Sequence, residues 1–350
     1  MARKTEKIDP STQLETQRHT VSFDSYDITV RQLMDMIDAD SVDISPEYQR
    51  HFVWDSERQS TFIESVFLGI PVPPIFMATN KDSTWELVDG VQRISSLINY
   101  CGSDKLRKRI KTASPLSIIG LEKLDSFNDL TYDALPKSLQ LAFQLRPIRV
   151  TTLNDKSSKS VRFDLFERLN TGGIKLQPQE IRNCIFRGEF NKSIKTLSGN
   201  ATFRKVAKVQ KGSENNGTSE ELVLRYFAFL SNYSKFDHSV NDFLNGYMEA
   251  NQNKKIPAPA IEEFNAVFEI LSAALPNGIT RTPSGKITPF NLFEAIAVGT
   301  ALALRLKKSI KKANILPLLT DLNLKKFTTG GTNSNRMVVG RIEYVRDRLV

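Results

Sequence analysis

Trp85-Glu86-Leu87-Val88-Asp89-Gly90-Val91-Gln92-Arg93 is the stretch of sequence that decides the fold. An apolar strand over 85–88 runs into Asp89-Gly90, and the residues that follow repeat apolar side chains at helical spacing. Gly90 permits a tight turn or the close approach of another backbone. The stretch therefore predicts a strand, a turn and a helix, with Asp89 beside the free amides and the positive dipole end of that helix.

The side chains at this turn have chemistry suited to an anion. Asp89 could hold a metal ion or polarise a water molecule, Gln92 could position that water, and Arg93 could neutralise phosphate charge. The plainer interpretation is that an Asp-Gly pair at a helix start serves only as an N-cap. The pattern does not identify a metal.

A second polar segment, Pro46-Glu47-Tyr48-Gln49-Arg50, lies upstream and is followed by Trp54. Arg50 could grip a phosphate with its planar guanidinium, and Gln49 could orient a base or a phosphate. The alternative is a surface loop in which Tyr48 and Trp54 pack as lids over the core. Both interpretations stay open at the level of sequence.

A third segment, Phe166-Glu167-Arg168-Leu169-Asn170-Thr171-Gly172-Gly173, lies further along the chain. Arg168 and Asn170 fall at a predicted helix end, and the two glycines let another backbone or a ligand come close. The alternative is a glycine C-cap that merely joins two helices. A predicted helix with Pro178 at its first position follows.

The remaining pattern predicts an α+β fold with a small mixed sheet, followed by an all-helical part. We expect a flexible N-terminal segment over 1–25, an α+β domain over 26–186 and a helical domain over 187–350. Residues 101–140 are weakly patterned and are interpreted as an insertion. Other strands are expected over 42–44, 75–78 and 145–153. Capping signals are Thr29-Gln32, Ser56-Gln59 and Thr218-Glu221. Late helices are expected near 219–232, 238–250, 258–275, 288–309, 313–320 and 335–349.

Composition describes an ordinary globular chain of about two domains, with 350 residues, 40% hydrophobic and 25% charged. The two cysteines, Cys101 and Cys184, stand alone, so thiolate zinc sites and paired redox chemistry are not supported. The three histidines lie far apart, which excludes a convincing His-Asn-His nuclease site. No apolar run is long enough to cross a membrane, and we expect a cytoplasmic protein.

Basic residues outnumber acidic ones by 48 to 39, giving a formal net charge of +9. The excess is concentrated over 187–211 and 301–326, each with seven basic residues and one acidic residue. Phosphate backbones attract such clusters by releasing counterions, so we expect DNA as a partner. The alternative is that these are solvated helix faces. The expected DNA-binding side chains are Lys307, Lys308, Lys311 and Lys312.

Taken in their order along the chain, the three polar segments resemble the N-terminal domain of GmrSD-type modification-dependent restriction endonucleases, a family within the ParB/sulfiredoxin-like superfamily. The resemblance extends weakly to Thr328-Thr329-Gly330-Gly331-Thr332-Asn333 and Arg341-Ile342. It implies a ParB-like fold that binds and can hydrolyse a nucleoside triphosphate, in a restriction or anti-phage system. The family signature reads Asp-Gly-Gln-Gln-Arg, whereas this chain has Val91 at the first glutamine, which favours binding without hydrolysis.

The resemblance also assigns roles to individual residues. Asp89, Gln92 and Arg93 are the expected catalytic residues, and the expected nucleotide- and phosphate-binding residues are Gln49, Arg50, Gly90, Arg168 and Asn170. The implied cofactor is a nucleoside triphosphate, with Mg²⁺ as a candidate ion. The implied partners are DNA, an effector subunit and a second copy of the chain.

Three function classes remain. The first is an enzyme, a candidate nucleoside triphosphatase or DNA endonuclease without a His-Asn-His domain. The second is a non-catalytic DNA-binding module of a restriction system. The third is an interaction protein whose helical half docks a partner.

Overall fold

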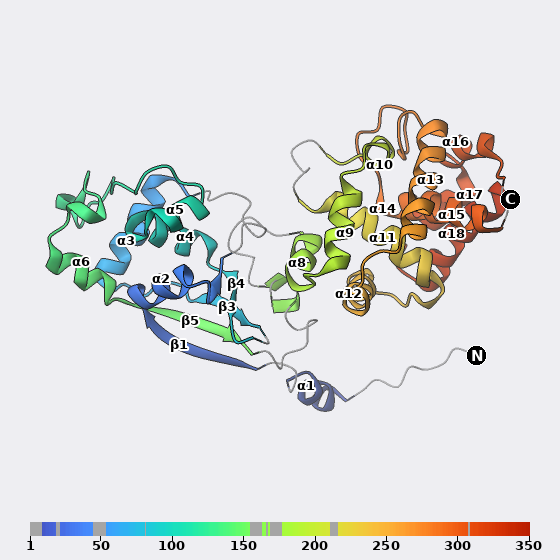
Figure 1. The fold of residues 1–350 in the computed structure, drawn as a ribbon. Helices are drawn as coiled ribbons and strands as arrows, with labels where there is room; N and C mark the ends of the chain where they lie inside the picture. The colour runs from blue at the N-terminus through green and yellow to red at the C-terminus, as the bar shows by residue number, and fades with distance from the viewer. Residues whose placement is uncertain are drawn as a thin grey trace. The chain divides into compact units, whose positions relative to one another are not determined.

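The computed structural model describes residues 9–18, 22–44, 54–80, 82–154, 163–165, 167–168, 177–210, 216–306 and 309–350. The chain divides into two compact units, Met1–Ile174 and Lys175–Val350. Figure 1 shows strands in the first unit and helices in the second. The division precedes the boundary expected after residue 186, because the helix α8 (Pro178–Ile185) packs with helices of the second unit.

Five strands form one mixed sheet in the first unit; four of them are predicted from the sequence, and the strand over 23–29 is not. They are β1 (Phe23–Thr29), β2 (Val42–Asp43), β3 (Ile75–Thr79), β4 (Trp85–Asp89) and β5 (Pro147–Leu153). The order is β1-β5-β3-β4-β2, in which β1–β5 and β3–β4 pair antiparallel, and β5–β3 and β4–β2 pair parallel. The α+β class is therefore confirmed.

The described part of residues 1–25, which were expected to be flexible, contains regular elements. Residues Pro10–Arg18 form the helix α1, and β1 begins at Phe23. The register pairs Phe23 with Leu153 and Thr29 with Pro147, so this polar segment gains its order from a strand far away in the sequence. A bidentate contact reinforces the pair, since Arg149 Nε and Nη2 donate to Asp27 at 2.9 and 2.8 Å.

Helices α2 (Val30–Asp38), α3 (Ser56–Leu68) and α4 (Val91–Cys101) accompany the sheet, and Figure 1 shows α2 beside β1 and β5. The Thr29-Gln32 capping box of α2 is confirmed. At α3 the cap is one residue earlier than expected, because the Asp55 carboxylate accepts from the amide of Arg58 at 2.8 Å.

The weakly patterned residues 101–140, interpreted as an insertion, contain regular elements. They include α5 (Asp104–Arg109) and two 3₁₀ turns, Asp125–Phe127 and Tyr132–Ala134, ahead of α6 (Lys137–Gln144). Their scattered apolar side chains are buried in the core of the first unit, among them Leu116, Ile118, Tyr132 and Leu135. The segment lacks periodicity because it packs as extended chain and short turns.

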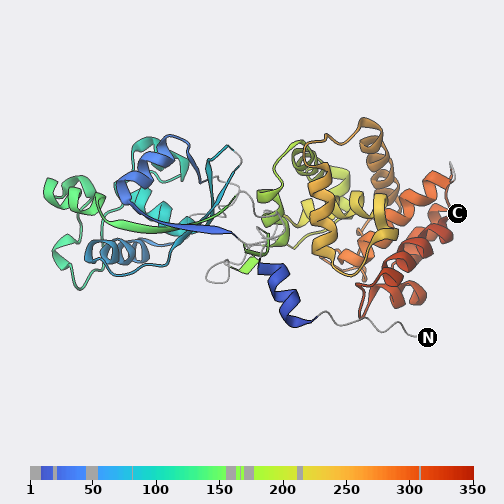
Figure 2. The same ribbon diagram turned by 90° about the horizontal axis from the view of Figure 1, so that it is seen from below.

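Within its described residues the second unit is helical, as predicted, and Figure 2 shows its helices from another direction. The predicted helices correspond to α8, α11 (Thr218–Asn232), α12 (Val240–Asn251), α13 (Ala258–Ala274), α14 (Phe290–Phe293) continuing into α15 (Gly299–Leu306), α16 (Ile315–Leu318) and α18 (Asn335–Leu349). Not anticipated were α9 (Glu189–Ser198), α10 (Ala201–Val206) and α17 (Leu322–Thr328).

Two local features of this unit refine the expectations. Pro178 occupies the first turn of α8, as predicted. The cap of α11 is Gly217 at φ +73°, and not Thr218, whose hydroxyl instead donates to Asn216. Between α14 and α15 the chain widens into a π-helix over Glu294–Val298, a rare form that is frequent at functional sites.

Both cysteines are free thiols. Burial raises the pKa of the Cys101 thiol to about 12, so it stays protonated at neutral pH. In the part of the chain that the structure describes, no helix has the length and apolar character needed to cross a membrane.

Candidate functional site

The predicted strand–turn–helix is present in the first unit, where β4 ends at Asp89 and α4 begins at Val91. Arg93 Nη2 donates to Asp89 Oδ2 at 2.6 Å and to the carbonyl oxygen of Pro74 at 3.2 Å. The side chains of Arg93 and Asp89 keep 15% and 31% of their surface exposed, respectively. Arg93 Nε is buried and has no hydrogen-bond partner among the described residues. The turn thus holds a fixed guanidinium with one donor unused.

Gly90 shapes the entrance to this turn. It adopts φ +110° and is the N-cap of α4, where no side chain accepts from the first helical amides. A Cβ at this position would lie 3.2 Å from Ile75 Cγ1 and 3.3 Å from Arg93 Nη2. Because glycine alone adopts this backbone conformation without strain, the sequence keeps the amide end of α4 open.

Gln92 ties the first predicted segment to the second. Its Oε1 accepts from the main-chain amide of Trp54 at 3.1 Å, and the carbonyl oxygen of Trp54 accepts from Gln59 Nε2 at 2.9 Å. Gln59 Oε1 in turn accepts from Asn99 Nδ2 at 2.8 Å. These hydrogen-bonded amides explain why Gln59 stands on the apolar side of α3, and they place Trp54, at the end of the 46–54 segment, against α4.

The other predicted residues of this site are only partly described. Gln49, Arg50 and Asn170 lie outside the described residues, and so does most of the 166–173 segment. Arg168 is described and exposed. The convergence of all these side chains on one cleft therefore stays a prediction, with Asp89, Gly90, Gln92 and Arg93 as its structurally defined part.

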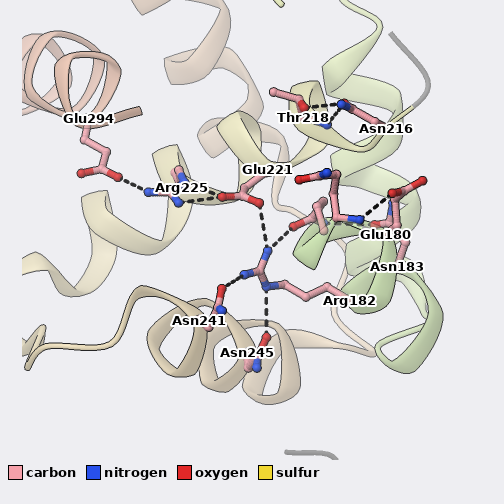
Figure 3. A network of polar contacts seen from close by, with 12 residues as sticks. Glu180, Arg182, Asn183, Asn216, Thr218, Glu221, Arg225, Asn241, Asn245 and Glu294 are labelled. Carbon is pink, nitrogen blue, oxygen red and sulfur yellow. Dashed lines mark hydrogen bonds and ion pairs between the residues drawn. The ribbon is translucent and has the colours of Figure 1, made fainter. Parts of the chain in front are cut away.

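The second unit contains a buried polar network that sequence reasoning did not assemble. Arg182 pairs with Glu221 at 3.2 Å, Glu221 with Arg225 at 2.6 Å, and Arg225 with Glu294 at 2.5 Å. Glu294 also pairs with Arg341. We call these five residues the charge ladder; its first four members are labelled in Figure 3.

The ladder is almost fully buried. Arg182 and Glu294 have no exposed surface, and Arg341 exposes 1%. Burial pushes the pKa of Glu221 upward, but the charges of Arg225 and Arg182 outweigh this, and the pKa ends below its ordinary value. Glu221 is therefore charged at neutral pH, and the ladder sets three guanidinium groups against two carboxylates.

The sequence contained signals for this network. Arg182 follows the third polar segment, Glu221 stands in an expected capping motif, and Arg341 belongs to the C-terminal resemblance. Glu294 is a lone charge ahead of an apolar run, and Arg225 lies one helical turn after Glu221 on α11. Each of these five residues could be explained by its neighbours in the sequence, and only the tertiary structure brings them together.

A cavity of about 790 Å³ opens beside the ladder. It is lined by Gln177, Pro178, Asn216, Thr218, Glu221, Arg225, His238, Ser239, Val240, Asn241, Phe290, Asn291, Glu294, Thr332, Asn333 and Arg341. Polar side chains predominate, and four of the five ladder residues reach its wall.

A second cavity, of about 760 Å³, has a different character. Arg204, Lys208 and Lys286 line it, together with apolar Val209 and Ile287, and none of the described residues that line it is a carboxylate. We call it the basic cavity. Its walls are fixed to each other, since the amide of Lys208 donates to the hydroxyl of Thr288 at 2.9 Å.

The DNA-binding surface expected from the sequence does not coincide with this cavity. Lys311 and Lys312 are exposed and do not line it, and Lys307 and Lys308 lie outside the described residues. That expectation therefore stays a prediction for all four side chains, and the basic cavity is a second place where a DNA strand could bind.

Among the described residues, no three histidine, cysteine, aspartate or glutamate side chains gather as they would around a metal ion. Asp89 could supply one carboxylate to a magnesium ion that a bound triphosphate carries, since Mg²⁺ is often held by one or two carboxylates and substrate phosphates. In the structure that carboxylate is engaged by Arg93.

Comparison with known proteins gives one match. The family model described as GmrSD restriction endonuclease, N-terminal domain, matches residues 30–187, which confirms the resemblance seen in the sequence. No curated protein matches the chain, and no solved structure does.

Proposed function

We propose that this chain, whose residues 30–187 belong to the GmrSD restriction endonuclease N-terminal domain family, is a nucleotide-binding, DNA-associated component of a restriction system. The family match supports the restriction role. Nucleotide binding, a ParB-like fold and any hydrolysis are the finer parts of the proposal. The site is the turn between β4 and α4.

One observation carries the nucleotide assignment. The amide end of α4 is left without a side-chain cap by Gly90, and Arg93 holds a guanidinium there with its Nε unpartnered among the described residues. Uncapped amides, a helix dipole and a fixed cation favour a phosphate group. The Asp89–Arg93 ion pair fits this role because a phosphate oxygen could replace the carboxylate as the partner of Arg93.

A screen of thermal unfolding against ATP, GTP, CTP and UTP, with and without magnesium, tests the proposal. A ligand that binds the native state raises the midpoint by mass action, and it adds about 2.7 kcal/mol to the free energy of unfolding at a hundredfold excess over the dissociation constant. We expect one triphosphate to stabilise the protein more than the others. A flat response to all four would leave the DNA-binding function as the better account.

The basic cavity supports the second candidate function, a DNA-binding module without turnover. Its three cations have no carboxylate partner in the described part of the chain, and its apolar side chains offer a surface for sugars and bases. A phosphodiester strand supplies the negative charge that this cavity lacks.

We expect Lys208→Ala combined with Lys286→Ala to weaken binding of a DNA duplex, because each lysine neutralises a phosphate. The slope of log affinity against log salt should become shallower by about 0.9 for each phosphate that no longer has a lysine beside it. Fluorescence anisotropy over a series of salt concentrations measures both quantities.

The paired variant Lys311→Ala with Lys312→Ala is the matched comparison, since it removes the same number of charges from the surface expected from the sequence. A decrease in affinity in that variant, with none in Lys208→Ala combined with Lys286→Ala, would place the DNA on that surface and not in the basic cavity.

A further inference from the structure

We infer that the cavity beside the charge ladder is a second anion site, which holds a phosphate-bearing ligand of nucleotide size in the helical unit. The site lies in the second unit and is separate from the β4–α4 turn, so it does not depend on the proposed function. The ligand is either a free nucleotide or a nucleotide that belongs to a DNA strand.

Helix direction makes the cavity attractive to anions. The amino-terminal ends of α8, α11 and α12 all contribute to its wall, through Pro178, Thr218 and Ser239. Each helix end contributes a partial positive charge of about half an elementary charge. The ladder brings two arginines and two glutamates to the wall, so its own charges balance there and the helix ends supply the positive excess.

Asn216, Asn241 and Arg341, which line the cavity, keep N–H donors without a protein partner in the described part of the chain. Asn216 Oδ1 accepts from the amide of Thr218 at 3.1 Å. Asn241 Oδ1 accepts from Arg182 Nη2 at 2.7 Å, a contact that Figure 3 shows. The Nδ2 groups of these two asparagines donate to no protein atom in the described part of the chain. Arg341 Nε is buried and unpartnered there as well.

This imbalance selects the ligand chemistry. The oxygens of both asparagines and of the ladder glutamates are already used by protein donors, whereas three N–H donors have no partner within the described protein. Phosphate oxygens accept hydrogen bonds and carry negative charge, so they match both features. A carbohydrate hydroxyl would need acceptors as well as donors, and these side chains have few acceptors to spare.

The volume of the cavity and the aromatic ring of Phe290 indicate a ligand larger than a bare phosphate. A volume of about 790 Å³ lies within the range of small-molecule sites. Phe290 keeps 37% of its surface exposed, and the Arg225 guanidinium lies 4.2 Å from its ring centroid. A planar base could stack on the free part of this ring, as bases do on aromatic side chains in single-strand binding.

Ser239→Asp tests the site without disturbing the fold. Ser239 caps α12 by accepting from the amide of Asp242 at 3.2 Å, and aspartate caps a helix as well as serine does. The variant therefore keeps the cap and adds a negative charge to the cavity wall. Ser103→Asp is the matched control, since Ser103 caps α5 in the other unit by accepting from the amide of Leu106.

Two probes distinguish the sources of the ligand. Calorimetric titration with deoxyadenosine monophosphate reports a free nucleotide, and fluorescence anisotropy with a short single-stranded oligonucleotide reports a strand. We expect at least one probe to bind the wild type, Ser239→Asp to weaken it by about tenfold or more, and Ser103→Asp to leave it unchanged.

Arg93→Ala separates this site from the β4–α4 turn. Weaker probe binding in Arg93→Ala together with wild-type affinity in Ser239→Asp would place the ligand in the first unit and overturn the inference. Equal affinity in Ser239→Asp and the wild type, or no binding of either probe to the wild type, would overturn it too.

Discussion

Glu294→Ala is expected to lower the free energy of unfolding by about 3–5 kcal/mol, because it leaves the buried Arg341 guanidinium without its carboxylate and removes one of the two carboxylate partners of Arg225. Glu294 has no exposed surface and accepts from both Arg225 and Arg341. Urea unfolding followed by circular dichroism measures the decrease. A domain is stabilised by only about 5–15 kcal/mol, so this one change removes a large share of the stability of the unit.

Two further variants make this expectation specific. Glu294→Gln keeps acceptor capacity but removes the charge, and we expect an intermediate decrease. Glu263→Ala removes a partly exposed partner of Arg305, whose Nε and Nη2 lie 2.6 and 2.8 Å from that carboxylate, and should cost less than about 1 kcal/mol. A Glu294→Ala effect as small as that of Glu263→Ala would mean that the ladder does not stabilise the fold.

The second large effect that we expect is a decrease in the rate of phosphate release when Asp89 or Arg93, at the β4–α4 turn, is replaced. The wild type, with Val91 in the signature, should release little phosphate from its triphosphate, and Val91→Gln should release more. When Asp89→Ala or Arg93→Ala is added to the Val91→Gln variant, the rate of phosphate release should decrease by a factor of about 10²–10³. This is the usual effect of removing one electrostatic contact to a transition state. A colorimetric phosphate assay measures the rates.

Asp40→Ala is the matched control for this pair. Asp40 forms an ion pair with Arg109 at 2.9 Å on the surface of the same unit, and neither residue belongs to the turn. We expect Asp40→Ala, added to the Val91→Gln variant, to leave the rate of phosphate release unchanged. Circular dichroism should show that all variants are folded. Asp89→Ala and Arg93→Ala variants as active as their parent would rule this turn out as the catalytic site.

The sequence predicted the parts of the fold that depend on local signals. The β4–α4 turn, the Thr29-Gln32 capping box and the Pro178 helix start all follow from residues a few positions apart, and the structure has them. Four of the five strands of the sheet followed from strand signals bounded by turns. These features were accessible because nearby residues alone determine them.

The features that the sequence did not predict depend on distant partners. β1 has the composition of polar chain, and it becomes a strand because β5, more than a hundred residues later, supplies its hydrogen bonds. The charge ladder joins α8, α11, the π-helix and α18, whose charged residues each had a plainer local explanation. No periodicity or short motif encodes such pairings.

Titration calorimetry of the preferred triphosphate into the wild type and into Arg93→Ala measures the central claim directly, since it reports binding whether or not hydrolysis follows. The account predicts that the triphosphate binds the wild type at the site in the first unit. It also predicts that Arg93→Ala weakens this binding by about a hundredfold, the effect of removing a charge-assisted contact of roughly 3 kcal/mol. An unchanged dissociation constant in a folded Arg93→Ala protein would contradict it.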